Sequence, residues 1–302
     1  MSKIFLVAGP TASGKSKIAC SIAKKINGEI INADSMQIYK ELKILTARPL
    51  KKEQQGIKHH LYGFVSVNKN FSTGEWIKHC LKKINEIKKR KKIPIIVGGT
   101  GLYFKSLENG LVQIPKILKH TRHNSIKLQK KLGQKLFYKN LIEIDPCSKI
   151  KIEPNDVQRS IRAYEVIKQT KLSLFEWFKK TNKYFDQKEF VKILIDIPRE
   201  ELLTKINKRI DKMIKLGAIN EAKKFDKMNI KKSNTSTHII GLKDLSRLNS
   251  NQSNIEDIKE KIAIKTRQYA KRQLTWSRGQ MKDWVKVNPK RLNDILKSIS
   301  KT

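Results

Sequence analysis

The chain opens with the apolar run Ile4-Phe5-Leu6-Val7-Ala8, which is followed directly by Gly9-Pro10-Thr11-Ala12-Ser13-Gly14-Lys15-Ser16. The apolar run predicts a short buried strand, and residues 17–26 continue with the spacing of a helix. The eight residues between them match the pattern G-x-x-x-x-G-K-S/T. Between a strand and a helix, this pattern is typical of a loop that binds phosphate.

Each fixed position of this pattern has a chemical role in binding phosphate. Gly9 and Gly14 allow successive backbone N–H groups to point at one anion, and the N-terminus of the following helix adds a partial positive charge. Lys15 would reach the phosphate oxygens, and the Ser16 hydroxyl would ligate Mg²⁺. The alternative is a glycine-rich turn that binds nothing, and the flanking strand and helix argue against it. The loop alone does not distinguish kinases, NTPases and pyrophosphate-releasing transferases.

The composition points to a polyanionic partner. The 302 residues carry a net charge of +39, with 54 lysines and 12 arginines. A chain this basic should attract nucleic acid, although a general lysine bias with solvated charges is the alternative. No apolar run approaches the roughly 20 residues of a membrane span, and no signal peptide precedes the first strand. The three cysteines are far apart and suggest neither a disulfide framework nor a zinc site, so we expect a cytoplasmic protein.

Polar residues follow two further predicted strands. Residues 28–32 predict a second strand, with Asp34 and Ser35 just beyond its carboxyl end. Ligands of open parallel sheets bind at this edge, so Asp34 would face the phosphate loop as a metal ligand or a general base. A simple helix N-cap is the alternative role. Residues 93–97 predict another strand, and the glycine-rich turn after it would bring the Thr100 hydroxyl into the same crevice.

The middle of the chain changes character. Strand patterns disappear from about residue 115, and we expect residues 115–187 to form an inserted helical domain between two parts of a core, 1–114 and 188–302. Within it, Arg159 and Arg162 are three residues apart and share a helix face. This face would contact a polyanion or would merely be solvated.

In the last third of the chain, strand patterns appear again beside helical ones. Residues 190–197 predict a strand, and a helix follows from Arg199 to a stop at Gly217, with Arg209 in its middle. The final helix, residues 258–278, interleaves basic and aromatic side chains in a way that suits RNA. Val285 and Val287 could form a last strand. The predicted fold class is therefore α/β: a P-loop NTPase-like parallel sheet flanked by helices, with a small helical insertion.

Five motifs together resemble one enzyme family. In order they are GPTASGKS (9–16), DSMQIY (34–39), PIIVGGTGLYF (94–104), PNDVQRSIRAYEV (154–166) and TRQYAKRQLTWSR (266–278). Their order and spacing resemble those of bacterial tRNA dimethylallyltransferases, also called tRNA isopentenyltransferases. The resemblance implies transfer of the dimethylallyl group of dimethylallyl diphosphate to N6 of adenine 37 in tRNAs that read codons starting with U. It also implies a need for Mg²⁺ and release of pyrophosphate.

The resemblance assigns roles by motif. Residues 9–16 would hold the diphosphate, Asp34 would be the general base, Thr100 would line the reaction channel, and Arg209 would stabilise the diphosphate. The implied partner is the anticodon stem-loop of tRNA, and we expect a monomer. The residues implied to contact tRNA are Asp34, Ser35, Met36, Gln37, Thr100, Arg122, Gln158, Arg159, Ser160, Ile161, Arg162, His238, Lys243, Lys271, Arg272, Gln273, Trp276 and Arg278.

The chain departs from the family's usual pattern in one loop. Glu41, Lys43 and Leu45 stand where glycines and an aspartate are usual, which leaves the local loop geometry open. Ser16 replaces the more frequent threonine and keeps the hydroxyl. Three other functions remain as alternatives: a P-loop kinase of a small metabolite, an isopentenyltransferase of free AMP, and an RNA-binding module with a vestigial loop. The segment 266–278 argues against the AMP enzyme.

Overall fold

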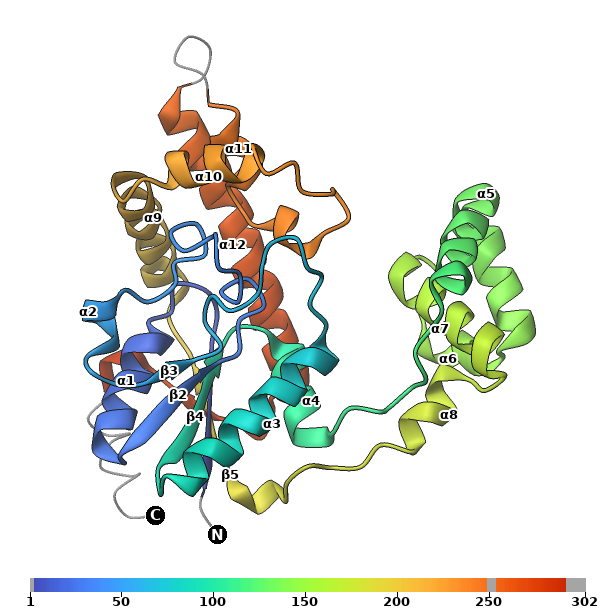
Figure 1. Cartoon of the computed structure of the whole chain (residues 1–302), viewed down its shortest axis with the longest axis horizontal. Coiled ribbons are helices and arrows are strands. Elements are labelled where there is room, and N and C mark those ends of the chain that lie inside the picture. The colour runs from blue at the N-terminus through green and yellow to red at the C-terminus, as the bar shows by residue number, and fades with distance from the viewer. Residues whose placement is uncertain (1–2, 249–253, 292–302) are drawn as a thin grey trace. The chain divides into compact units, whose positions relative to one another are not determined.

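One parallel sheet organises the larger part of the protein (Figure 1). The structure is a computed structural model that describes residues 3–248 and 254–291. Within these ranges the sheet has six strands in the order β3-β2-β4-β1-β5-β6, and every neighbouring pair is parallel. The strands are β1 (Ile4–Ala8), β2 (Gly28–Asn32), β3 (His59–His60), β4 (Ile93–Gly98), β5 (Phe190–Ile195) and β6 (Val285–Val287). The predicted α/β fold with a parallel sheet is confirmed.

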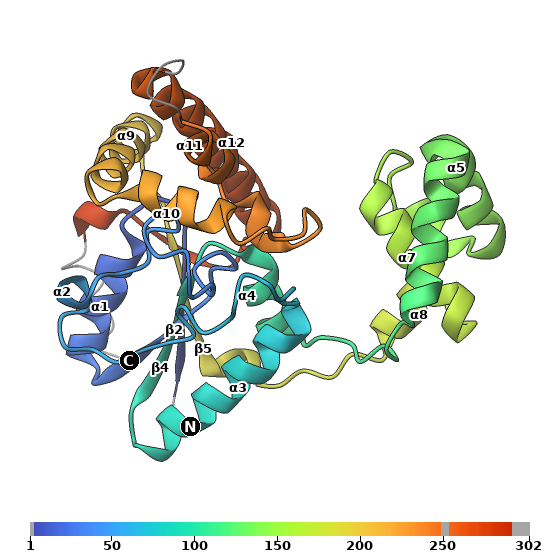
Figure 2. The ribbon, with the colours of Figure 1, turned by 45° about the horizontal axis from the view of Figure 1, so that its top comes forward.

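Helices cover both faces of the sheet, because successive side chains of the central strand β1 point to opposite faces and all five are apolar and buried. Phe5 and Val7 pack with Ile18 and Ile22 of α1 (Lys15–Lys25) in one buried cluster. On the opposite face lie α3 (Thr73–Lys89) and α4 (Gly101–Asn109), as Figure 2 shows. A capping box formed by Ser72 and Glu75 begins α3.

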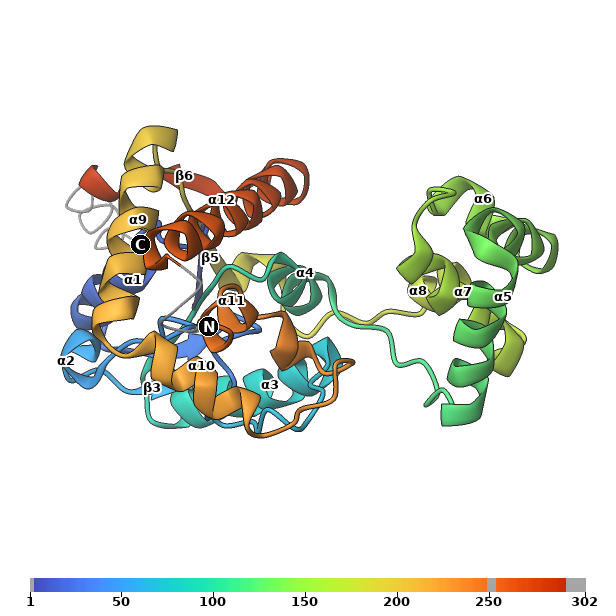
Figure 3. The same cartoon turned by 90° about the horizontal axis from the view of Figure 1, so that it is seen from above.

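A second apolar cluster lies over the carboxyl ends of the strands. It joins residues of the 38–67 segment to α9 (Arg199–Lys215), α10 (Ala218–Asp226), α11 (Leu242–Ser246) and α12 (Ile255–Gln280). In this layer α9 and α12 lie side by side (Figure 3). The remaining elements of this unit are α2 (Lys51–Gln54), η1 (Gln187–Glu189), η2 (Thr235–His238) and η3 (Pro289–Arg291).

The loop that departs from the family pattern is held by two carboxylates. Glu221 of α10 accepts hydrogen bonds from the backbone N–H groups of residues 43, 44 and 45, at 2.7 to 3.0 Å. Glu41 accepts one from the Val67 N–H at 3.1 Å. Leu45 is only 4% exposed and belongs to the apolar cluster. The loop is therefore well anchored without the usual glycines.

The contacts of the chain separate a smaller unit, Leu107–Tyr184, from the rest. It contains α5 (Lys119–Ile144), which is interrupted at Gly133, and α6 (Cys147–Lys151), α7 (Val157–Thr170) and α8 (Leu174–Lys179). Its own core includes Leu141, Ala163 and Val166. The sequence predicted an inserted domain over residues 115–187. This range begins eight residues after the start of the smaller unit and ends three residues after its end. Across the described part of the chain, no helix has both the length and the apolar character needed to span a membrane.

A buried carboxylate joins the amino end of β2 to neighbouring elements. Glu29 is 1% exposed, and its oxygens lie 2.7 Å from His60 Nε2 and 2.7 Å from an Arg90 guanidinium nitrogen, with Lys92 Nζ at 3.6 Å. Burial alone would raise the pKa of Glu29. The hydrogen bonds and charges of Arg90 and His60 outweigh it and lower this pKa to about 2.

This depressed pKa makes stability depend on pH. Because the pKa of Glu29 is 4.5 unfolded and about 2 folded, the ionised carboxylate should contribute about 3 kcal/mol at neutral pH. This contribution should be complete above pH 4.5 and disappear as the pH falls toward 2. Urea unfolding at several pH values should show this loss for the wild type and not for Glu29→Gln. Glu200→Gln, which changes an exposed carboxylate in the first turn of α9, is the control, and an unchanged pH slope in Glu29→Gln would contradict the assignment.

Candidate active site

The first glycine loop connects β1 to α1 at the carboxyl edge of the sheet. Its chain reverses through left-handed residues, Ala12 with φ 63° and Gly14 with φ 87°. Gly14 is the N-cap of α1 and offers no side chain to cap the first N–H groups of the helix. These groups therefore remain available to an anion.

Two half-buried cations converge on this loop. Lys15 Nζ donates to the Pro10 carbonyl at 3.1 Å, and Arg209 of α9 donates to the Thr11 hydroxyl at 2.8 Å and to the Thr46 carbonyl at 3.3 Å. Burial lowers the pKa of Lys15 to about 8, against the raising effect of the Asp34 charge, and the Arg209 charge lowers it further. Burial likewise lowers the pKa of Arg209. Two cations held in so little water favour a bound anion.

Asp34 faces these cations from the end of β2. Its Oδ1 accepts the Met36 N–H at 2.9 Å, and its own N–H donates to Asn32 Oδ1 at 3.0 Å. The carboxylate closes a turn, and no helix begins between residues 33 and 50, all of which the structure describes. The alternative that Asp34 is a helix N-cap is therefore wrong. Besides desolvation, the Asp34 charge raises the pKa of three tyrosines around it, Tyr62, Tyr103 and Tyr269.

The second glycine-rich turn is tied to the same edge. Thr100 Oγ1 accepts the Ser35 N–H at 3.0 Å and donates to Ser35 Oγ at 3.3 Å, and the Thr100 N–H donates to the Ala33 carbonyl. A Cβ on Gly101 would lie 2.2 Å from the Trp276 ring, and one on Gly99 would lie 2.2 Å from the Gln273 amide nitrogen. Glycine is required here because α12 packs directly on the turn.

Gln273 holds the two loops together. Its Oε1 accepts the Thr11 N–H at 2.8 Å, and its Nε2 donates to the Gly99 carbonyl at 2.8 Å. The side chain is buried, and both ends of its amide are bonded inside the protein. The helical spacing of 266–278 did not show that the Gln273 amide turns inward to the two loops. Gln273 also lines the cavity beside Thr100, and its direct contact with tRNA stays a prediction.

Two small cavities meet at Tyr269 and Arg272. The first, here called the Thr100 cavity, has a volume of about 260 Å³, and Ser35, Thr100 and Trp276 are among its lining residues. The second, here called the Arg209 cavity, has about 230 Å³ and combines Thr11, Asp34, Arg209 and His238 with an apolar wall. That wall comprises Met36, Leu45, Ile206, Ile210, Met213, Ile239, Ile240 and Ile262.

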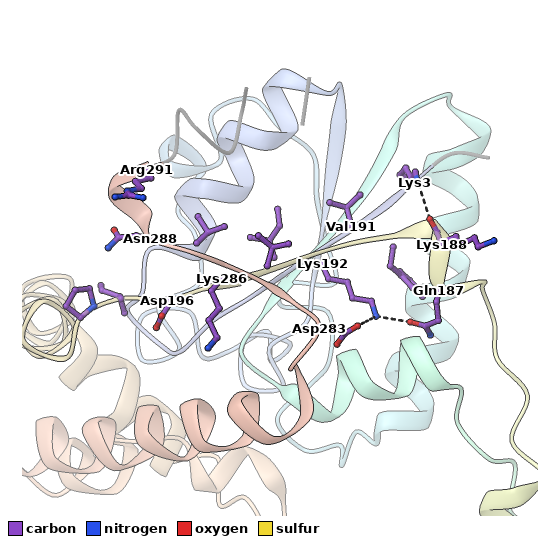
Figure 4. Close-up of a pocket in the computed structure, with 16 residues that line it drawn as sticks. Lys3, Gln187, Lys188, Val191, Lys192, Asp196, Asp283, Lys286, Asn288 and Arg291 are labelled. Atoms are coloured by element: carbon purple, nitrogen blue, oxygen red, sulfur yellow. Dashed lines mark hydrogen bonds and ion pairs between the residues drawn. The ribbon is translucent and has the colours of Figure 1, made fainter. Parts of the chain in front are cut away.

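A larger hollow lies elsewhere. About 1300 Å³ in volume, it runs along β5 and β6 and contains no residue of either glycine loop (Figure 4). Lys192 Nζ donates there to Gln187 at 2.8 Å and to Asp283 at 2.7 Å. Size alone therefore does not identify the active site.

The other predicted tRNA contacts fall into separate groups. In the smaller unit, Gln158 and Arg159 are exposed and Ile161 is half-buried, while Arg122 and Arg162 lie near the same carboxylate, that of Glu165. Ser160 is fully buried and accepts a hydrogen bond from Gln134 at 3.2 Å, so it offers no surface to a tRNA and that prediction is corrected.

In the larger unit, the residues predicted to contact tRNA also lie in different places. The Gln37 amide is bonded to the carbonyls of residues 46 and 47, and Lys243 is exposed on α11. Lys271 and Arg278 line a different groove, beside Arg199 and Arg267, between α9 and α12. Tyr269 was missed as a site residue, although it lies four residues before Gln273 in the quoted motif and hence on the same helix face.

Comparison with known proteins gives a consistent result. The family model described as IPP transferase matches residues 37–280. A tRNA dimethylallyltransferase of Pelagibacter ubique (strain HTCC1062) is 54% identical over 301 residues, covering 100% of this chain and 96% of that protein. A tRNA dimethylallyltransferase of Ehrlichia canis (strain Jake) is 40% identical over 280 residues, covering 93% of each.

Solved structures agree in fold. The crystal structure of the full-length tRNA isopentenylpyrophosphate transferase of Bacillus halodurans gives a TM-score of 0.70 at 31% identity, covering 100% of this chain and 96% of that chain. A eukaryotic dimethylallyltransferase acting on tRNA gives a TM-score of 0.81 at 28% identity, covering 95% of this chain and 74% of that chain.

The lowered pKa of Lys15 leads to a prediction for anion binding. Since this pKa is about 8, Lys15 is charged at pH 7 and increasingly neutral above pH 8, so affinity for inorganic pyrophosphate should fall as the pH rises through this range. Lys15→Arg should lack this fall, because arginine stays protonated. Calorimetry from pH 6.5 to 9.5 tests this. The ionisation of pyrophosphate affects both proteins alike, so it cancels in the ratio of the wild-type affinity to the Lys15→Arg affinity. A ratio that does not change with pH would refute the role of Lys15.

Proposed function

This chain belongs to the IPP transferase family and transfers a dimethylallyl group to tRNA, and from that premise we propose how its residues perform the reaction. The donor is dimethylallyl diphosphate. We propose that the acceptor is N6 of adenine 37 in the anticodon stem-loop of tRNAs reading codons that start with U. The products are then N6-isopentenyladenosine and diphosphate. The observation that carries the mechanism is that Asp34 shares one cavity with Thr11 of the glycine loop and with Arg209.

The donor's two ends fit two parts of this cavity. The diphosphate would bind the N–H groups of residues 14–16, at the start of α1, and the charges of Lys15 and Arg209. Its five-carbon chain would lie against the apolar wall of the Arg209 cavity, where it leaves water. The cations stabilise the negative charge that develops on the diphosphate as it leaves, which is the main electrostatic demand of the reaction.

Asp34 would act as the general base. The exocyclic amine of adenine is a poor nucleophile, so removal of its proton helps as the new bond forms. The N6–C1 bond forms, the C1–O bond to the diphosphate breaks with its electron pair going to oxygen, and the N6 proton passes to the Asp34 carboxylate. The Met36 N–H that donates to Asp34 Oδ1 fixes the orientation of this carboxylate.

The hydroxyl at the end of the loop also fits Mg²⁺. The Ser16 side chain at the start of α1 is a ligand of the hard kind that this ion prefers. In the part of the chain that the structure describes, no three His, Cys, Asp or Glu side chains gather to hold a metal by themselves. Oxygens of the diphosphate would therefore complete the coordination, and the ion would supply charge neutralisation to the leaving group.

The nucleotide would enter from the Thr100 cavity. Adenine 37 must leave the stack of the anticodon loop, at a cost of a few kcal/mol. Tyr269 and Trp276 line this cavity and offer aromatic faces, and Arg272 offers a cation for the phosphates. Exposed arginines of the smaller unit, Arg122 and Arg159, would bind phosphates of the stem. Action as a monomer in the cytoplasm, where tRNA is found, stays a prediction.

The role of Asp34 is tested by Asp34→Asn, which keeps the size of the side chain and an oxygen for the Met36 N–H. We expect transfer to fall by at least about a hundredfold, because general base catalysis is lost, while tRNA affinity stays within several-fold. Transfer of labelled dimethylallyl to tRNA and filter binding measure the two quantities. Asp226→Asn, which changes an exposed carboxylate of α10, is the control. Normal transfer by Asp34→Asn would exclude Asp34 as the base.

The role of the smaller unit is tested by salt. Affinity for tRNA should fall steeply as salt is raised, because phosphate contacts release counterions. Arg159→Ala should weaken binding and reduce the slope of log affinity against log salt by about one. Lys24→Ala, in the last turn of α1 and away from the glycine loop, should leave the slope unchanged. Equal slopes for all three proteins would mean that Arg159 does not bind phosphate.

A further inference from the structure

Thr11 is held from two helices at once. Its N–H donates to Gln273 of α12, and its hydroxyl accepts from Arg209 of α9. The Thr11 N–H is therefore committed to the protein and is not offered to a phosphate. Its contribution is to fix the direction of the peptide groups beside it, which belong to the anion-binding loop.

The other end of Gln273 fixes the second loop. Its Nε2 donates to the Gly99 carbonyl, one residue before Thr100. The same helix presents Tyr269, Arg272 and Trp276 to the cavities. Gln273 is thus a direct link between the helix that faces the nucleotide and the loop that faces the donor.

We propose that Gln273 is a positioning residue for the donor, which sets the shape of the phosphate loop by bonding Thr11 and Gly99 at once. This inference rests on the proposed function, in which the loop binds dimethylallyl diphosphate. Both polar ends of the Gln273 amide are bonded to the protein. Its loss should weaken donor binding and leave tRNA binding almost unchanged.

The chemistry of the two contacts explains why a glutamine is needed. The Thr11 N–H requires an acceptor, and the Gly99 carbonyl requires a donor, and one carboxamide supplies both. Glutamate would satisfy Thr11 but would set a carboxylate oxygen against the Gly99 carbonyl. Methionine would keep the volume and satisfy neither group, so both backbone groups would be buried without a partner.

Donor binding by the purified full-length protein tests the proposal without turnover. Calorimetry with dimethylallyl diphosphate in the absence of tRNA should give a Kd about tenfold higher for Gln273→Met than for wild type, the effect of losing a buried hydrogen bond. The KM for the donor should rise likewise, and the KM for tRNA should stay within about twofold. Gln268→Met, which changes an exposed glutamine of the same helix, should match wild type.

A double-mutant cycle gives a second, independent measurement. A Cβ at position 99 would meet the Gln273 amide nitrogen at 2.2 Å, so Gly99→Ala alone should displace Gln273 and weaken donor binding. In a Gln273→Ala background the same change meets mainly the Gly9 carbonyl at 3.2 Å and should cost much less. The two effects should therefore be strongly non-additive.

The outcomes separate this inference from the function on which it rests. A wild-type protein that binds no dimethylallyl diphosphate would refute the proposed function. A wild type that binds it, with Gln273→Met and Gln273→Glu binding equally well, would refute only the positioning role. Variants that lower the melting temperature but keep the donor Kd would also refute it, since Gln273 would then be merely structural. Additive effects in the cycle would do the same.

Discussion

The shortage of negative charge around the first glycine loop is the constraint on which the rest of the site depends. Lys15 and Arg209 are both half-buried there, and desolvation lowers the pKa of both. The charge of Asp34 acts on both cations, and one carboxylate does not balance two cations. In the proposed mechanism a diphosphate would supply the missing charge, and Asp34 would lie close enough to act on the acceptor. Donor affinity and the placement of the base are therefore parts of one electrostatic balance.

The fold gathers these groups from distant parts of the sequence. In a parallel sheet the carboxyl ends of β1, β2 and β4 lie at one edge, which brings the glycine loop, Asp34 and Thr100 together. The two long helices α9 and α12 then bring Arg209 and Gln273 onto that edge. The loop itself supplies no cation except Lys15, so the site is complete only when the last third of the chain has packed over the first.

The sequence predicted the parts of the site that depend on local pattern, and it failed where a side chain's neighbours come from across the fold. The strand, loop and helix at residues 4–26 could be recognised because each is encoded by adjacent residues. Helical spacing placed Ser160 and Gln273 within motifs but could not say that both are buried, because that depends on Gln134 for the first and on two glycine loops for the second. Glu221 gave no signal at all, since its partners are backbone N–H groups nearly 180 residues away.

The second glycine-rich turn shows how packing, and not the turn itself, can require glycine. Neither Gly98, Gly99 nor Gly101 has a positive φ, so the backbone there is open to any residue. What excludes a side chain is proximity: a Cβ would lie 2.0 Å from the Ala33 carbonyl oxygen at Gly98, and 2.2 Å from Gln273 and from Trp276 at the other two positions. These glycines let β2 and α12 approach the end of β4. The positions of these glycines therefore depend on what packs on the turn. Gln273 and Trp276 fill the space and belong to α12, the helix that the proposed function places against the nucleotide.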